Sequence, residues 1–134
     1  MEHNSHTYLP DSFSINNEIV EDHKGQIGNS ELVNHSKRLS KKLWNVTEGV
    51  WCFVGNGLSN QTFIEGPEGL IIIDTGECNE EMTEALTALR EKTQAPIAGI
   101  IYTHFHYVAG TEAIFTSEER NDIPIWGHER ITTN

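Results

Sequence analysis

Two short apolar runs, separated by an amphipathic segment, constrain the fold of this chain more than any other feature. The runs are Leu70–Ile73 and Ile97–Ile101, and their length is typical of buried strands. Between them, after Asn79 as a helix cap, four apolar residues recur at i, i+3, i+4 and i+7, which predicts one buried stripe of a helix. These four residues are Met82, Ala85, Leu86 and Leu89. A strand, a helix and a strand in this order predict an α/β fold whose sheet is at least partly parallel.

Alternating apolar and polar residues before the first run predict antiparallel strands. Residues 43–46 and 50–54 alternate around Thr47-Glu48-Gly49, which predicts a hairpin with a glycine turn. A third strand at residues 61–65 leads into the turn signal Gly66-Pro67-Glu68-Gly69. Further along, the pattern predicts a short helix over residues 110–115 and a last strand over residues 123–126.

The N-terminal region has a different character. Residues 1–29 lack sustained periodicity and are rich in Asn, Ser, His and Asp, which predicts a flexible lead-in before a domain over residues 30–134. Ser30 is expected to cap a helix with apolar positions as far as Leu43.

Composition excludes several classes of partner. The chain has 134 residues and a net charge of −11, which argues against binding to nucleic acid or to an anionic membrane, since both need a basic surface. Its two cysteines, Cys52 and Cys78, form neither a disulfide framework nor a metal-binding pair, although a single bridge stays open. The chain shows no apolar leader and no membrane-spanning run, so we expect a cytoplasmic protein.

Three polar residues stand where chemistry is expected. Asp74 follows the first apolar run, and His104 and His106 lie just beyond the second. In an open α/β sheet, ligands gather beyond the carboxyl ends of the strands. Two histidines two residues apart on an extended segment point to the same side and suit a shared metal such as zinc, with a carboxylate to orient one ring. The alternatives are an incidental histidine pair and a turn aspartate that bonds its own backbone.

Three blocks together resemble the metallo-β-lactamase-fold hydrolases, most of all their alkylsulfatase branch. The blocks are Gly57–Gly66, Gly69–Gly76 and Ile100–His106, and the likeness extends from about Leu43 to Arg130. The resemblance implies an αββα sandwich, of which this chain would hold the N-terminal half. It also implies zinc and the hydrolysis of ester-type bonds, including sulfuric esters, by a metal-bound hydroxide.

The family motif is His-x-His-x-Asp-His, and this chain matches half of it. His104 and His106 match the ligands of one metal, and Asp74 matches the aspartate at the strand end. Val108 and Ala109 stand where the family has the aspartate and the last histidine, so the resemblance implies one zinc and makes a second doubtful. His128 matches no ligand and is expected to be a surface or packing residue.

The remaining ligands of the family lie in sequence beyond this chain, as does the second sheet. We therefore expect a fragment of a longer enzyme with one apolar sheet face exposed, and pairing of two copies into a homodimer is the alternative way to cover that face. The first functional hypothesis is a metal-dependent hydrolase of a small-molecule ester. The second is a metal-depleted, non-catalytic relative that binds a ligand or a partner.

Overall fold

The protein divides into two compact units. The structure, a computed structural model, describes residues 18–115 and 122–133. Contacts within the chain separate residues 1–38 from residues 39–134, and we call the second unit the sheet domain. The predicted division after residue 29 stays a prediction. No helix among the described residues is both long and apolar enough to cross a bilayer.

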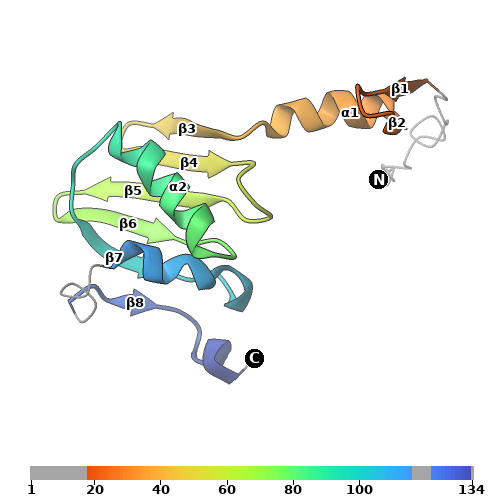
Figure 1. The fold of residues 1–134 in the computed structure, drawn as a ribbon. Coiled ribbons are helices and arrows are strands. Elements are labelled where there is room, and N and C mark those ends of the chain that lie inside the picture. The colour runs from red at the N-terminus through yellow and green to blue at the C-terminus, as the bar shows by residue number, and fades with distance from the viewer. Residues whose placement is uncertain (1–17, 116–121, 134) are drawn as a thin grey trace, which may run out of the picture. The chain divides into compact units, whose positions relative to one another are not determined.

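The described part of the first unit is a small hairpin followed by a short helix (Figure 1). Strands β1 (Ile19–Glu21) and β2 (Ile27–Asn29) pair antiparallel, and helix α1 (Ser30–Ser36) follows at once. Asn29 is the N-cap, not Ser30 as predicted, because its side chain accepts hydrogen bonds from the backbone N–H groups of the first helical turn. The helix ends in a 3₁₀ turn, η2 (Lys37–Leu39), well before Leu43.

The sheet domain is built on one six-stranded mixed sheet, which confirms the predicted α/β class (Figure 1). The strands lie side by side in chain order: β3 (Lys42–Thr47), β4 (Val50–Val54), β5 (Gln61–Gly66), β6 (Gly69–Ile73), β7 (Ile97–Ile101) and β8 (Ile125–Trp126). Neighbours from β3 to β6 are antiparallel, whereas β6, β7 and β8 are parallel. The predicted hairpin and the parallel strand pair around the helix are therefore both confirmed.

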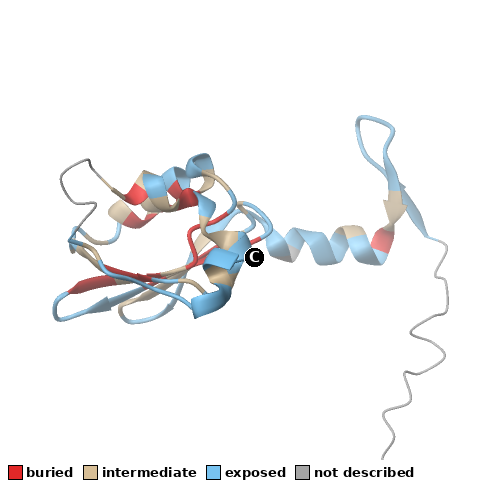
Figure 2. Ribbon diagram, turned by 90° about the horizontal axis from the view of Figure 1, so that it is seen from below, coloured by how far each residue is buried: buried red, intermediate tan, exposed pale blue. Residues whose placement is uncertain are grey.

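Helix α2 (Asn79–Arg90) covers one face of the sheet, and the core lies between these two layers (Figure 2). The core residues come from four strands, α2 and the segment after β7: Phe53, Phe63, Leu70, Ile72, Met82, Ala85, Leu89, Ile100 and Ile114. Three of the four residues in the predicted helical stripe are among them, and Leu86 packs against them while partly buried. The cysteines are both free and half-buried.

The first turn of α2 is stabilised differently from the prediction. The N-cap residue is Cys78, not Asn79, and its side chain makes no cap hydrogen bond. Glu81 instead reaches back, because its carboxylate accepts the backbone N–H of Glu77 at 2.9 Å. The backbone N–H of Glu80 and the side chain of Cys78 hydrogen-bond to the Glu80 carboxylate and hold its pKa below the ordinary value.

The opposite face of the sheet is apolar and open to solvent, as the sequence predicted. The strand register places four large exposed side chains on it: Trp44, Ile64, Ile101 and Trp126. On β6 itself, Leu70 and Ile72 are fully buried but Ile71 and Ile73 are only half-buried. Among the described residues this strand is therefore buried on one face only, whereas a continuous apolar run is typical of a strand covered on both faces.

Two 3₁₀ segments follow β7, and the second of them packs against α2. They are η3 (Phe105–Tyr107) and η4 (Ala109–Ile114), the latter being the predicted short helix, and a third segment, η5 (Glu129–Thr133), follows β8. Gly110 is buried where η4 meets the loop before α2. A Cβ atom at this position would overlap the carbonyl oxygen of Thr75 and crowd Met82. The close approach therefore requires glycine.

We predict that Gly110→Ala destabilises the protein by about 1–3 kcal/mol, because the added methyl group has no space. Urea unfolding followed by circular dichroism measures the change. Gly66→Ala is the matched control, since a Cβ atom there would come no nearer than 3.8 Å to the carbonyl oxygen of Gly69. Equal stability of the two variants would contradict the close packing of Gly110.

Candidate metal site

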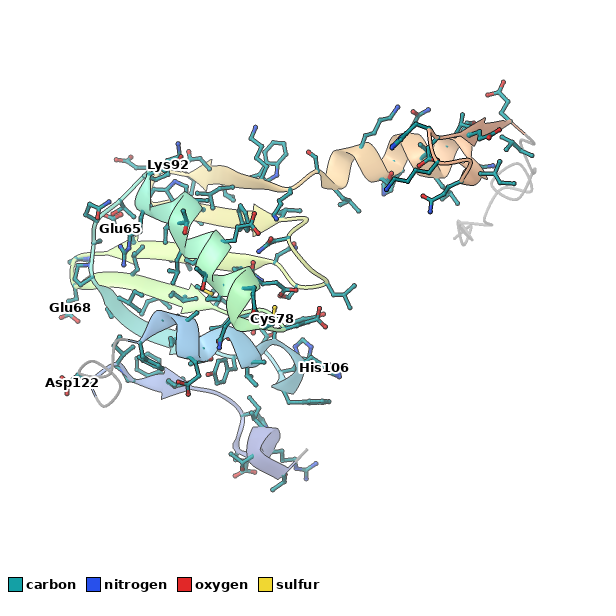
Figure 3. The ribbon with its side chains drawn as sticks, in the orientation of Figure 1. Glu65, Glu68, Cys78, Lys92, His106 and Asp122 are labelled. Carbon is teal, nitrogen blue, oxygen red and sulfur yellow. The ribbon has the colours of Figure 1, made fainter. Side chains whose placement is uncertain are left out.

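The predicted site residues lie together beyond the carboxyl ends of β6 and β7. The backbone N–H of Asp74 donates to the carbonyl of Ile101 at 2.9 Å, so the ends of the two strands are fastened at this point. Figure 3 shows His106 at the same end of the sheet domain as Cys78, whereas Glu68 and Lys92 lie at the other end. The predicted convergence of Asp74 with the histidine segment is therefore present.

Asp74 is held in an unusual conformation. Its φ of 60° lies in the left-handed region, which non-glycine residues seldom adopt, and its side chain is buried. One carboxylate oxygen accepts the backbone N–H of Thr103 at 2.9 Å, and the other accepts the Thr103 hydroxyl at 2.7 Å. Asp74 is thus more than a turn residue, because it binds the segment that carries the histidines.

Thr103 connects Asp74 to His104. The Thr103 hydroxyl oxygen lies 2.9 Å from Nδ1 of His104. Because that hydroxyl already donates its proton to Asp74, its oxygen can only accept, so Nδ1 of His104 carries the proton. The other ring nitrogen, Nε2, then has a free lone pair, which is the form that binds a metal.

His106 lies close to His104 but not on an extended segment. His104 itself is extended, with φ −163° and ψ 178°, whereas η3 bends the chain directly after it. The predicted extended geometry was therefore wrong at residues 105–107, because the carbonyl of Tyr107 turns back to accept the backbone N–H of Thr75 at 2.9 Å. The centroids of the two imidazole rings are nonetheless 5.2 Å apart.

This ring separation is compatible with a shared metal. In a tetrahedral zinc site each imidazole centre lies roughly 3.2 Å from the ion, which places two rings roughly 5 Å apart. Among the described residues, no group of three or more His, Cys, Asp or Glu side chains is arranged to hold a metal. The two predicted ligands, His104 and His106, therefore stop short of the three that catalytic zinc sites have.

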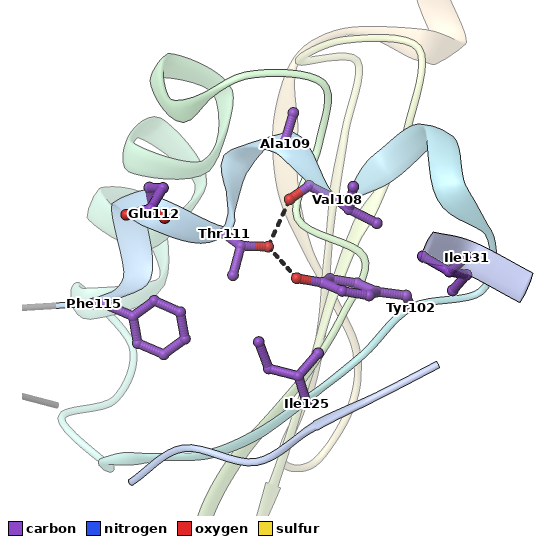
Figure 4. Close-up of a pocket in the computed structure, with 8 residues that line it drawn as sticks. All are labelled: Tyr102, Val108, Ala109, Thr111, Glu112, Phe115, Ile125 and Ile131. Atoms are coloured by element: carbon purple, nitrogen blue, oxygen red, sulfur yellow. Dashed lines mark hydrogen bonds between the residues drawn. The ribbon is translucent and has the colours of Figure 1, made fainter. Parts of the chain in front are cut away.

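Val108 and Ala109 line a neighbouring pocket with a volume of about 480 Å³ (Figure 4). The fold uses the backbone of Val108, whose carbonyl accepts the Thr111 hydroxyl at 2.7 Å. Figure 4 shows that Thr111 also bonds to the hydroxyl of Tyr102. The side chains of Val108 and Ala109 offer no metal ligand, in agreement with the sequence.

Thr103 is the residue that sequence analysis missed. It lies between the strand and His104 and provides both hydrogen bonds that join Asp74 to the histidine segment. A threonine directly before the first histidine was a visible signal, since its hydroxyl can accept one hydrogen bond while it donates another. The assignment of His104 and His106 as metal ligands, with Asp74 behind them, stays a prediction.

Part of the sheet domain is similar in sequence to known proteins. Residues 54–107 match the family model of the metallo-beta-lactamase superfamily. A linear primary-alkylsulfatase of Pseudomonas sp. is 41% identical over 76 residues, which cover 53% of this chain and 14% of that protein. The alkyl/aryl-sulfatase BDS1 of Saccharomyces cerevisiae is 42% identical over 65 residues, which cover 48% of this chain and 10% of that protein. The match thus spans a small part of each relative.

Solved structures show the same fold. The stereoselective inverting sec-alkylsulfatase Pisa1 from Pseudomonas sp. superimposes with a TM-score of 0.64 and 21% identity, over 80% of this chain and 21% of that chain. A metallo-β-lactamase from Hirschia baltica gives a TM-score of 0.54 and 18% identity, over 69% of this chain and 45% of that chain. The sheet domain is therefore part of a metallo-β-lactamase fold, and its sequence is similar to the alkylsulfatase branch of that superfamily.

Proposed function

We propose that this chain contributes to a metal-dependent hydrolase of ester-type bonds, with sulfuric esters of small molecules as the substrate class. The observation that carries the proposal is the hydrogen-bond chain from Asp74 through Thr103 to His104, because it leaves Nε2 of His104 free beside the ring of His106. The alkylsulfatase relatives support the choice of ester.

Zinc is the proposed metal, since neutral imidazoles suit it and the relatives belong to a metal-dependent superfamily. A bound zinc ion lowers the pKa of a water molecule toward neutrality and polarises the ester. In this chain, His104 and His106 would hold the ion. Thr103 and Asp74 fix the tautomer and orientation of His104. A third protein ligand is required from outside the described residues.

A second function is supported by the residues at 108 and 109. Val108 and Ala109 cannot serve a second metal, and the fold does not need ligands there because it holds Val108 by its carbonyl group. A metal-depleted relative that binds a ligand or a partner without hydrolysis is therefore the competing proposal.

We predict that the protein binds about one zinc ion and that His104→Ala and His106→Ala each weaken binding at least about tenfold, because each removes one imidazole ligand. Competition with a chromophoric chelator measures the affinity. His23→Ala is the matched control, since His23 is exposed and lies in the first unit. If all three variants bind zinc as the unchanged protein does, the metal proposal is wrong.

The double substitution Val108→Asp with Ala109→His tests whether the side chains at these two positions prevent the binding of a second metal. Because it restores the family's carboxylate and imidazole at these positions, we expect zinc stoichiometry to rise above that of the unchanged protein, as measured by elemental analysis after dialysis. Val108→Asn with Ala109→Gln is the control with uncharged side chains. An unchanged stoichiometry in the first variant would show that these two positions do not limit metal binding.

Asp74→Asn should weaken zinc binding about tenfold to hundredfold, the range found when outer-shell partners of metal ligands are changed. Asparagine tolerates the left-handed backbone of residue 74. Its amide N–H₂ group would donate to the Thr103 hydroxyl, which would then donate to Nδ1 of His104 and move the ring proton to the metal-binding Nε2. The chelator competition measures this loss.

Thr103→Val complements that test, because it removes the hydroxyl at nearly constant shape. We expect a loss of zinc affinity similar to that of Asp74→Asn. Thr83→Val provides the control, since Thr83 is exposed on α2 and its hydroxyl makes no hydrogen bond within the described residues. Wild-type zinc affinity in both Asp74→Asn and Thr103→Val would contradict the proposed role of the hydrogen-bond chain.

A further inference from the structure

A second pocket, with a volume of about 280 Å³, opens beside His104 on the side of η5. Its lining residues are Thr103, His104, Phe105, His128, Arg130 and Ile131. They come from two segments, the one that follows β7 and the one that follows β8. We call this space the η5 pocket. It combines one permanent cation, two imidazoles and two apolar side chains.

The orientation of His128 is fixed by its neighbour. The backbone N–H of Arg130 donates to Nδ1 of His128 at 3.2 Å. Nδ1 is therefore an acceptor, and the proton of the neutral ring lies on Nε2. The Nε2–H group of the neutral His128 ring can therefore donate a hydrogen bond to a ligand.

Arg130 supplies a positive charge to the η5 pocket. Within the residues that the structure describes, its guanidinium group has no carboxylate at ion-pair distance, and it makes no side-chain hydrogen bond. The chain as a whole carries a net charge of −11, so an arginine without an ion pair among the described residues contrasts with the acidic character of the chain. A guanidinium group and an imidazole N–H are donors suited to an oxyanion with several acceptor oxygens.

The rest of the η5 pocket is apolar. Phe105 is 39% exposed and Ile131 is half-buried, and Ile131 also lines the larger pocket next to it. An anion attached to a hydrocarbon group could therefore place its oxygens on Arg130 and His128 while its carbon chain contacts Phe105 and Ile131.

We propose that the η5 pocket binds the oxyanion head of an amphiphilic anion. Arg130 and His128 donate to the head group, and Phe105 and Ile131 contact the adjoining carbon chain. The choice of anion rests on the proposed function, but neither Arg130 nor His128 is a proposed metal ligand. Binding to the metal-free protein is therefore expected.

Isothermal titration of metal-free protein with hexanesulfonate tests the proposal, since a sulfonate has no ester bond to hydrolyse. We expect Arg130→Gln to weaken binding about tenfold and His128→Ala to weaken it less, because a charged donor contributes more than a neutral one. Lys92→Gln is the matched control, since it removes the same charge at the far end of the sheet domain (Figure 3). An equal loss in Lys92→Gln and Arg130→Gln would overturn the proposal. Circular dichroism of each variant verifies folding, and Arg130→Lys, which keeps the charge, should retain part of the affinity.

The length of the sulfonate's carbon chain tests the proposed contacts with Phe105 and Ile131. Methanesulfonate should bind more weakly than hexanesulfonate, and Ile131→Ser should reduce this difference while leaving methanesulfonate binding unchanged, because Phe105 still contacts the chain. Equal affinities for both sulfonates in the unchanged protein would overturn the amphiphilic assignment.

His106→Ala separates the two proposals, because it removes a proposed metal ligand that does not line the η5 pocket. Loss of sulfonate binding in metal-free His106→Ala would contradict the η5 pocket, whatever the outcome for zinc.

Discussion

The pair of hydrogen bonds that Asp74 accepts from Thr103 is the interaction on which the site depends. Each carboxylate oxygen takes one donor, at 2.9 Å and 2.7 Å, so the side chain can adopt only one orientation. The left-handed backbone of Asp74 is what turns its carboxylate toward the end of β7. The hydrogen bonds to Thr103 therefore offset the conformational strain of Asp74, and they also order the histidine segment that follows β7.

The histidine turn is fastened to the core from its other side as well. Thr75 donates its backbone N–H and its hydroxyl to the carbonyl of Tyr107, at 2.9 Å and 3.2 Å. The same hydroxyl lies 3.0 Å from that of Thr111, and Gly110 lies against the Thr75 carbonyl. Both ends of the short segment from Thr103 to Gly110 are thus attached to residues 74 and 75. The two rings are held by the loop after β6, a strand whose Leu70 and Ile72 side chains are fully buried in the core.

Sequence periodicity was sufficient to predict the sheet domain but not its local bonds. Alternation and apolar runs identify strands and α2 because burial of one face imposes a period. The caps were misplaced by one residue at Asn29 and Cys78, since neighbouring polar residues compete for the same role. Similarly, the bend at residues 105–107 depends on a hydrogen bond to Thr75, thirty-two positions away from Tyr107, which a local pattern does not contain. The convergence of Asp74 with His104 was predictable, because parallel strands end at the same edge.

At residues 108 and 109 the side chains can change without affecting the bonds that hold the fold. The structure needs the carbonyl of Val108, which accepts both the hydroxyl and the backbone N–H of Thr111, and it needs the glycine at position 110. Neither requirement involves the side chain at 108 or at 109, where Ala109 is exposed. Substitutions there can remove ligands without disturbing the bonds among Asp74, Thr103 and His104. The hydrogen bonds of the fold therefore support the His104 side chain, whereas at position 108 they involve only the backbone carbonyl.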